Sequence, residues 1–257
     1  MLKVTGQTHK GAVRKQNQDI FRCNVLGERL GYAMVCDGMG GENAGDVAST
    51  ATIEIIDRYL KKGLKAGMGL NSVRSLMLSA VSTANAVVYE QSKLRPEFSG
   101  MGTTLVLAVV CGETLHTCHV GDSRIYRVAG GEAEQLTRDH SMVQMLVDRG
   151  ELTEDEAQSH PKRHYITRAV GVAPRVEPDY AEHPIDGPLA LLLCSDGLSN
   201  YLEPQAVAGQ VTECLERGSA TPLINYALHS GGADNITAVL LTVDQATEAA
   251  RDRKSTR

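Results

Sequence analysis

The amino-acid sequence predicts an α+β fold built around antiparallel sheet. Two observations predict it: consecutive short apolar runs in the middle of the chain are joined by tight turns, and helical periodicity is confined to separate segments. Tight turns join antiparallel strands, whereas parallel strands need a longer crossover that usually contains a helix. No tandem repeat or domain boundary interrupts the pattern. We therefore expect one catalytic domain over residues 1–245 and a frayed charged tail over residues 246–257.

The first part of the chain predicts strands followed by two long helices. Residues 2–8 and 20–24 have the composition of strands separated by a polar turn, and the apolar run 30–36 predicts a third strand. Apolar residues then recur at helical spacing over 44–62 and over 71–94. The apolar stripes of both helices are expected to face the core.

The middle and the end of the chain predict further strands. Residues 105–111 and 115–120 flank Gly112-Glu113, a pattern typical of a two-residue hairpin. Residues 125–128 form the next short run, and the last strands are expected at 188–194 and 236–243, with helices over 203–217 and 221–229 between them. Segments of this length and order fit one large domain with a substantial core.

Residues 137–174 differ from the surrounding strands. The segment is polar, rich in histidine and arginine, and contains only short helical patterns. Long irregular insertions in compact domains often carry function. We interpret it as a flap, with a solvated surface segment as the alternative.

Composition excludes several functional classes. The net charge is -5 with no basic block, which argues against nucleic-acid binding. No apolar run approaches the roughly 20 residues of a membrane span, and the N-terminus lacks the apolar core of a signal peptide. The six cysteines form no CxxC pair, which favours reduced thiols. We therefore expect a cytoplasmic protein that binds neither membranes nor nucleic acid.

Four aspartates lie next to an end of a strand-like run: Asp37, Asp122, Asp196 and Asp234. Converging carboxylates repel one another unless cations neutralise them, and an oxygen-only ligand set favours Mg²⁺ or Mn²⁺ over zinc. Two such ions roughly 4 Å apart can activate a water for attack on phosphorus. Arg14 could then clamp the phosphoryl group, although it could equally be a surface arginine. The pattern predicts a metal-dependent phosphoryl hydrolase; ordinary turns with capping aspartates are the alternative.

The same residues resemble the metal-dependent protein phosphatases (PPM, type 2C). The resemblance covers about residues 3–243, and residues 160–171 are similar to the bacterial members. Six motifs carry it, in the order of the family: Arg14-x-x-Asn17-Gln18-Asp19, Asp37-Gly38-Met39-Gly40-Gly41, Gly102-Thr103-Thr104, Gly121-Asp122-Ser123-Arg124, Ser195-Asp196-Gly197-Leu198 and Gly232-x-Asp234-Asn235-Ile236-Thr237.

The resemblance implies a four-layer αββα sandwich, with two antiparallel sheets flanked by helices and a flap near the active site. It implies a serine/threonine phosphatase that hydrolyses phosphoserine and phosphothreonine through a water or hydroxide bridging two divalent metals, Mn²⁺ or Mg²⁺, without a phosphoenzyme. It implies phosphorylated proteins as substrates, among them a bacterial serine/threonine kinase and its targets. We expect a monomer.

The resemblance also implies metal ligands. Asp37 would bridge both ions and Gly38 would offer its carbonyl oxygen to the second. Asp196 and Asp234 would complete the first site, and Asp122 together with Asp196 would hold a third, weaker ion.

Three further residues receive roles by resemblance. Asp19 would orient metal-bound water, and Arg14 would bind the substrate phosphate, so that these two and Asp37 form the catalytic set. The flap around His160 would shape access of the substrate.

Two positions depart from the animal members of the family. Met39 stands where they carry a histidine proposed as general acid, and Gln18 stands where they carry an acidic residue. The donor of the leaving-group proton is therefore open between a metal-bound water and a flap histidine, His160 or His164.

Other classes remain to be weighed. A haloacid-dehalogenase phosphatase would need a second aspartate where Met39 stands. A pseudophosphatase that binds phosphoproteins without turnover would be marked by lost ligands, and the matched aspartates are all present. Small phosphoesters stay open as substrates, because a metal centre alone does not choose the leaving group.

Overall fold

Two antiparallel sheets form the centre of the computed structural model, which describes residues 1–244, except for the side chains of residues 42 and 43. The predicted tail at 246–257 lies outside the described residues. One sheet contains, in spatial order, β1 (Leu2–His9), β11 (Ile236–Val243), β10 (Leu189–Cys194), β7 (Arg124–Ala129) and β8 (Glu132–Gln135). The other contains β2 (Asp19–Gly27), β3 (Leu30–Met39), β5 (Leu105–Cys111), β6 (Thr114–Val120) and β9 (Asp179–Pro184), with the short β4 (Gly102–Thr103) paired to β3.

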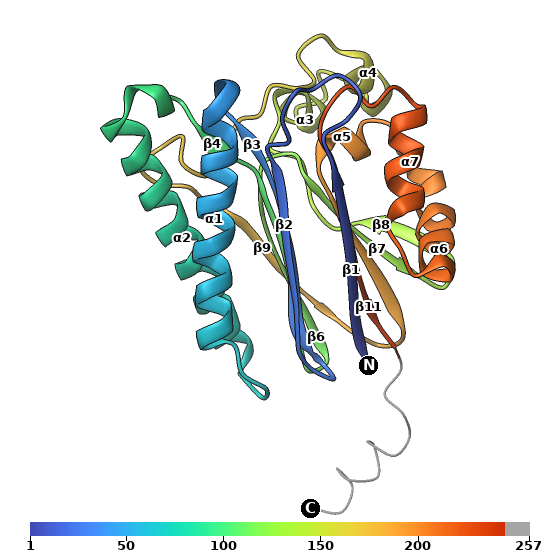
Figure 1. Ribbon diagram of the computed structural model, residues 1–257. Coiled ribbons are helices and arrows are strands. Elements are labelled where there is room, and N and C mark those ends of the chain that lie inside the picture. Colours follow the sequence, from blue (N-terminus) through green and yellow to red (C-terminus); the bar gives the residue numbers. More distant parts are fainter. Residues whose placement is uncertain (245–257) are drawn as a thin grey trace, which may run out of the picture.

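Helices cover the outer face of each sheet (Figure 1). The long helices α1 (Gly41–Gly63) and α2 (Leu70–Leu94) pack on the six-stranded sheet, and α6 (Val207–Arg217) and α7 (Thr221–His229) pack on the five-stranded one. The layers are therefore helices, sheet, sheet and helices, which confirms the αββα sandwich.

Alternation along β3 shows how one strand serves two layers. Tyr32 and Met34 are fully buried toward α1 and α2, whereas Ala33 and Val35 are fully buried between the two sheets. Successive side chains of a strand point to opposite faces, so a strand covered on both sides becomes apolar throughout. This is why residues 30–36 form an unbroken apolar run.

Several elements differ from the sequence predictions. The predicted helix over 44–62 begins three residues earlier, because Gly40 adopts a φ of 122° that lets the chain turn directly into α1. The predicted helix over 203–217 starts as a 3₁₀ turn, Pro204–Ala206, and becomes α-helical only at Val207. The strand β9 and the short helix α5 (Asp196–Ser199) were not predicted, because β9 is rich in polar side chains and α5 is very short.

The segment over 137–174 contains α3 (Met142–Asp148) and α4 (Glu154–Ser159) and is otherwise irregular. Its two ends are held by isolated β-bridges, Ser141 to Ile166 and Thr103 to Val170. We keep the name flap segment for residues 137–174. In Figure 1 it lies above one edge of the two sheets. Within residues 1–244, no helix is both long and apolar enough to cross a bilayer.

Candidate active site

The sandwich gathers the predicted carboxylates at one edge. Asp37 lies near the end of β3, opposite Asp19 at the start of β2, and Asp122 lies in the turn between β6 and β7. Asp196 opens α5 directly after β10, and Asp234 lies just before β11. Because neighbouring strands are antiparallel, the end of one strand and the start of the next meet at the same edge.

A cleft of about 1120 Å³ opens at this edge. Its walls include every predicted metal ligand and the predicted phosphate ligand: Arg14, Asp37, Gly38, Asp122, Asp196 and Asp234. The side chain of Asp19 is buried beneath them. The structure thus brings together residues that are spread over more than 200 positions of the sequence.

His160 does not line this cleft. Its ring nitrogen Nδ1 accepts a hydrogen bond from the backbone of Lys162 at 3.1 Å, at the end of α4. The flap residues that do line the cleft are Arg163, His164 and Ile166. The structure therefore separates the two flap histidines, and only His164 reaches the cleft wall.

Burial and mutual repulsion oppose ionisation of the carboxyl groups. Burial raises the pKa of Asp37 well above its ordinary value, and the charges of Asp19 and Asp196 raise it further. The pKa of Asp122 is raised to about 8 by burial and by Asp196, and that of Asp19 to about 7, mainly by burial. The pKa of Asp196 is raised by burial and by Asp234. Such a cluster holds its negative charge near neutral pH only if cations join it.

Two carboxylate oxygens point to the same conclusion. Among the described atoms, Asp19 Oδ1 and Asp196 Oδ1 are buried and accept no hydrogen bond. A buried acceptor without a partner costs roughly 1–3 kcal/mol, and a bound cation would remove that cost. The donors are all oxygens, which is the ligand set that Mg²⁺ and Mn²⁺ prefer. The residues present therefore fit divalent cations.

Asp19 is fixed by hydroxyl groups from the other sheet. Ser195 Oγ donates to Asp19 Oδ2 at 2.6 Å, and Thr237 Oγ1 donates to the same oxygen at 2.7 Å. These two donors stabilise the ionised form and hold the carboxylate in one orientation. The second oxygen, Oδ1, is left unused by the protein.

Arg14 reaches the acidic cluster from the loop between β1 and β2. Its Nη2 donates to Asp234 Oδ2 at 2.7 Å, and the side chain is 56% exposed. This hydrogen bond raises the pKa of the guanidinium. The guanidinium has five N–H donors, so it can hold an oxyanion with the others. Arg14 therefore lies in the wall of the cleft, where an oxyanion could reach it.

Asn235, which belongs to the sixth sequence motif but received no role from the sequence, is a structural residue of the site. Its side chain accepts from the backbone N–H of Gln18 at 2.8 Å and donates to the carbonyl oxygens of Lys10 and Gln16 at 2.9 and 2.8 Å. Three bonds from one amide thus fix the loop that carries Arg14. Its position directly after Asp234 was the feature of the sequence that could have indicated a role in the site.

Close backbone packing explains two glycines of the motifs. A Cβ at Gly38 would lie 2.1 Å from the carbonyl oxygen of Gly45, and a Cβ at Gly197 would lie 2.0 Å from that of Asn235. Any side chain at either position would force the backbone apart. The first close approach packs α1 against the end of β3, and the second packs α5 against the start of β11.

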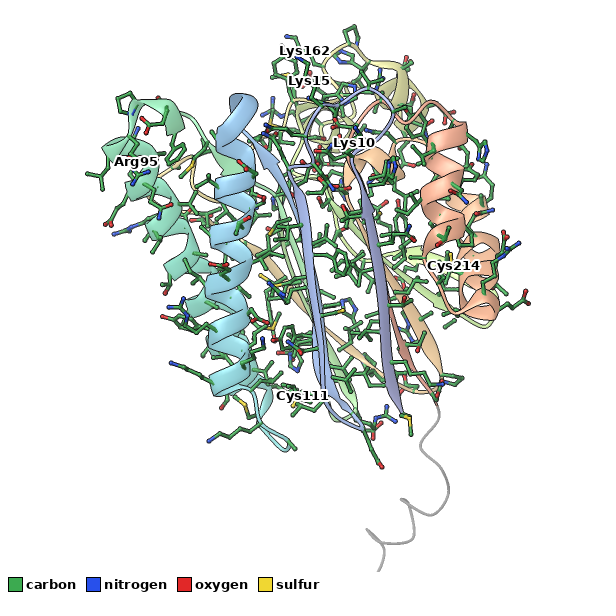
Figure 2. The ribbon with its side chains drawn as sticks, in the orientation of Figure 1. Lys10, Lys15, Arg95, Cys111, Lys162 and Cys214 are labelled. Carbon is green, nitrogen blue, oxygen red and sulfur yellow. The ribbon has the colours of Figure 1, made fainter. Side chains whose placement is uncertain are left out.

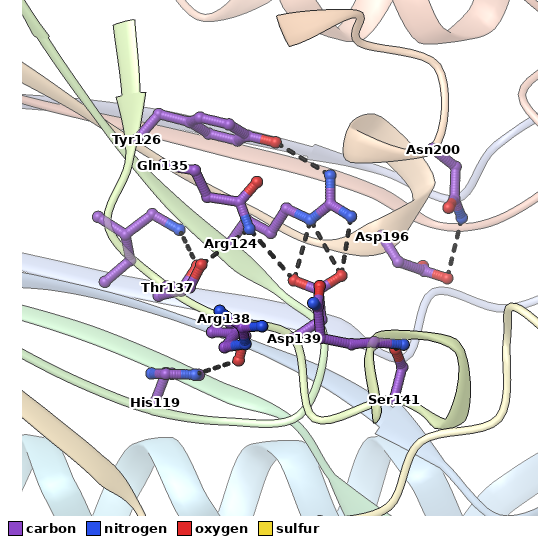
Figure 3. Close-up of polar contacts among 12 residues, drawn as sticks. His119, Arg124, Tyr126, Gln135, Thr137, Arg138, Asp139, Ser141, Asp196 and Asn200 are labelled. Carbon is purple, nitrogen blue, oxygen red and sulfur yellow. Dashed lines mark hydrogen bonds and ion pairs between the residues drawn. The ribbon is translucent and has the colours of Figure 1, made fainter. Parts of the chain in front are cut away.

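The base of the flap segment is tied to the five-stranded sheet by an ion pair (Figure 3). Arg124 makes a bidentate pair with Asp139, with nitrogen–oxygen distances of 2.8–3.1 Å, and also donates to Tyr126 Oη at 3.2 Å. Bidentate geometry is the strong form of an arginine–carboxylate pair.

In the same view, Asn200 donates to Asp196 Oδ2 at 3.1 Å.

A second cluster holds both ends of the flap segment to the six-stranded sheet. The rings of His119 and His140 stack at 4.6 Å, and Arg168 donates to Asp179 at 2.7 Å. The spacing of His119, His140 and Asp179 would also suit a metal ion. However, the guanidinium of Arg168 lies 3.1 Å from His140 Nε2, so an internal cation already fills that position. We interpret the cluster as a clasp for the flap segment.

The fold and the acidic cleft define a class: αββα proteins whose strand-end aspartates gather in one cleft that fits divalent cations. The chain matches the family model described as Protein phosphatase 2C over residues 5–229. It is 37% identical over 245 residues to the serine/threonine protein phosphatase PstP of Mycobacterium tuberculosis, covering 95% of this chain and 45% of PstP. It is 32% identical to the protein phosphatase PhpP of Streptococcus pneumoniae, covering 95% of this chain and 98% of PhpP. The chain therefore spans less than half of PstP and nearly all of PhpP.

Solved structures agree. The serine/threonine phosphatase of S. agalactiae superposes with a TM-score of 0.85 at 36% identity, covering 94% of this chain and 99% of that one. The catalytic domain of PstP in complex with two manganese ions superposes with a TM-score of 0.82 at 33% identity, covering 95% and 99%. The chain belongs to the protein phosphatase 2C family, as the sequence motifs predicted.

Proposed function

We propose that this chain is a metal-dependent protein serine/threonine phosphatase that hydrolyses phosphoserine and phosphothreonine. The observation that carries the proposal is the convergence of four strand-end aspartates and one arginine in a single cleft. Membership of a family whose named relatives are serine/threonine phosphatases supports it.

Two divalent ions, Mn²⁺ or Mg²⁺, are proposed to bind between the carboxylates. Asp37, Asp196, Asp234 and the carbonyl oxygen of Gly38 would hold them, and Asp122 with Asp196 would hold a third, weaker ion. When bound, such ions supply positive charge that acidifies a water molecule and polarises the phosphoryl group. The unpartnered buried oxygen of Asp196 and the raised pKa of Asp37 support this assignment.

The remaining steps fall to the chain's own residues. Arg14 binds the phosphoryl oxygens with the guanidinium donors that Asp234 does not use. Asp19, held by Ser195 and Thr237, orients the attacking water through its free oxygen Oδ1. Asp19 is thus a rigid acceptor at the floor of the site.

Attack by water without a phosphoenzyme on a serine, threonine or tyrosine is supported by the hydroxyl groups of the cleft wall. Of the described cleft-lining residues, Thr104 and Tyr201 carry hydroxyl groups. The Thr104 hydroxyl bonds to the backbone of Asp37 and to Ser123, and Tyr201 accepts from Ala233. Both hydroxyls are occupied in structural contacts. His164, the flap histidine that lines the cleft, is the side-chain candidate for protonating the leaving group.

The physiological setting is proposed by family analogy. Substrates would be phosphorylated proteins, including a serine/threonine kinase and its targets, and the enzyme would act as a cytoplasmic monomer. A pseudophosphatase and a phosphatase of small phosphoesters are the competing functions. The presence of all four aspartates in one cleft favours turnover over mere binding.

Hydrolysis of a phosphothreonine peptide with Mn²⁺, with Mg²⁺ and with EDTA tests the proposal. We expect turnover that requires a metal and is lost in Asp196→Asn. Turnover of small phosphoesters but of no phosphopeptide would indicate the small-molecule alternative. A folded protein that hydrolyses neither, with any metal, would instead indicate the pseudophosphatase.

A further inference from the structure

Charge is segregated along this chain. It carries 31 acidic and 26 basic residues, yet residues 1–18 and 157–176 contain no aspartate or glutamate. The first run includes the loop that carries Arg14, and the second includes the turn of the flap segment after α4. Both runs contribute to the walls of the acidic cleft.

Some of the positive side chains of these runs lie at the cleft or at the same end of the molecule. Lys15 from the loop and Arg163 from the flap segment line it together with the carboxylates. Lys10 and Lys162, their neighbours, lie at the same end of the molecule as Lys15 (Figure 2). We call this set the cationic rim: Lys10, Lys15, Lys162 and Arg163.

The cationic rim is available for a ligand. All four side chains are exposed, and no described carboxylate lies within ion-pair distance of any of them. By contrast, the nearby Arg168 and Arg138 of the flap segment are paired with Asp179 and Asp148. The rim cations therefore form no ion pair with the described part of the chain.

The backbone beneath the rim is fixed. Asn235 binds the carbonyl oxygens of Lys10 and Gln16, which anchors the loop on one side of the cleft. On the other side, Tyr165 N donates to Lys162 O at 3.1 Å and Met142 N donates to Tyr165 O at 2.8 Å. Charges on a fixed backbone lose less entropy when they bind than charges on a floppy tail.

Resting on the phosphatase function proposed above, we propose that the cationic rim selects phosphopeptides whose flanking residues carry further negative charge. A peptide that places its phosphoresidue at the centre of the cleft would pass the loop on one side and the flap segment on the other. Acidic side chains or a second phosphate on the flanks would then meet the rim cations. Without the rim, the acidic walls would repel such a peptide.

Three phosphothreonine peptides test the proposal: one with neutral flanks, one with glutamates on both sides, and one with a second phosphothreonine nearby. For the wild type with Mn²⁺, we expect kcat/KM about tenfold higher for the anionic peptides, mainly through KM, as two or more exposed charge contacts allow. The comparison of glutamate with phosphate identifies the source of the negative charge. The preference should shrink as the salt rises from about 0.05 to about 0.5 M.

The variant Lys15→Glu/Lys162→Glu should abolish the preference, measured as the ratio of kcat/KM for the anionic peptides to kcat/KM for the peptide with neutral flanks. The milder Lys15→Gln/Lys162→Gln should lower it about threefold, which keeps the test valid if the charge reversal impairs folding. Lys62→Glu, in the last turn of α1, is the matched control and should retain the wild-type preference.

Equal kcat/KM for all three peptides in the wild type at low salt would overturn the rim proposal while leaving the phosphatase function intact. Retention of the preference in both lysine variants would also overturn it. Failure of the wild type to hydrolyse any peptide or p-nitrophenyl phosphate would contradict the phosphatase function itself.

Discussion

The carboxylate cluster makes the stability of the protein depend on pH in a direction that metal should reverse. In the metal-free fold the pKa of Asp19 is raised from 3.8 to about 7, and that of Asp122 to about 8. In the unfolded chain both groups return to ordinary values and release their protons at lower pH. Between about pH 4 and 7 the folded state therefore binds more protons, and stability falls as the pH rises.

The magnitude follows from the proton affinity of Asp19. Since a tenfold change in proton affinity is about 1.4 kcal/mol, the shift from 3.8 to about 7 corresponds to about 4 kcal/mol. Protons shared with the neighbouring aspartates reduce the part that belongs to Asp19 alone, so we expect about 2–4 kcal/mol between pH 5 and pH 8. Saturating Mn²⁺ supplies the missing positive charge and should flatten or invert this dependence.

Urea unfolding at a series of pH values, in EDTA and in Mn²⁺, measures the effect. Asp19→Asn, which has no charge to bury, should weaken the pH dependence in EDTA. Asp186→Asn, an exposed carboxylate between β9 and β10, is the control and should leave it unchanged. Constant or rising stability from pH 5 to pH 8 in EDTA would refute the argument that burial and repulsion dominate the site.

Three substitutions test individual residues. Asp37→Asn should lower activity by about 10²-fold or more and weaken Mn²⁺ binding measured by calorimetry; unchanged affinity would remove Asp37 from the ligand set. Arg14→Ala should raise KM about 10- to 100-fold in peptide hydrolysis, because a charge-assisted clamp is lost; an unchanged KM would make it a surface residue. Asn235→Ala should lower the free energy of unfolding by about 2 kcal/mol, since three part-buried backbone groups lose their partner, and a change below about 0.5 kcal/mol would contradict that role.

The sequence was sufficient for the residues whose position is decided locally. Asp37 and Asp196 follow apolar runs and precede glycine, so the strand end, the turn and the carboxylate are all visible within a few residues. The apolar run before Asp37 also correctly predicted a strand, and the structure shows that this strand is buried on both faces. The sequence alone could not establish that the acidic strand ends meet at one site. Their meeting depends on the antiparallel arrangement of the strands in the two sheets.

The features that were not predicted depend on distant partners. The clasp joins His119, His140, Arg168 and Asp179. The local sequence around each of these residues does not indicate that it contacts the other three. His160 received its role from the resemblance of the flap, but at the end of α4 its ring nitrogen accepts a hydrogen bond from the backbone of Lys162. Such outcomes are decided by tertiary packing, which local periodicity does not record.

The pairing of β1 with β11 has a consequence for how the protein matures. Leu2 lies opposite Val243 and His9 opposite Ile236, so the first and last strands of the fold are neighbours in one sheet. Contacts of such large sequence separation form slowly, since a long loop must close before they are rewarded. Arg14 and Asp234 meet only after this closure. A chain in which β1 has not yet paired with β11 therefore lacks the Arg14–Asp234 contact, and the arginine side of the cleft is completed only when the two ends of the fold have met.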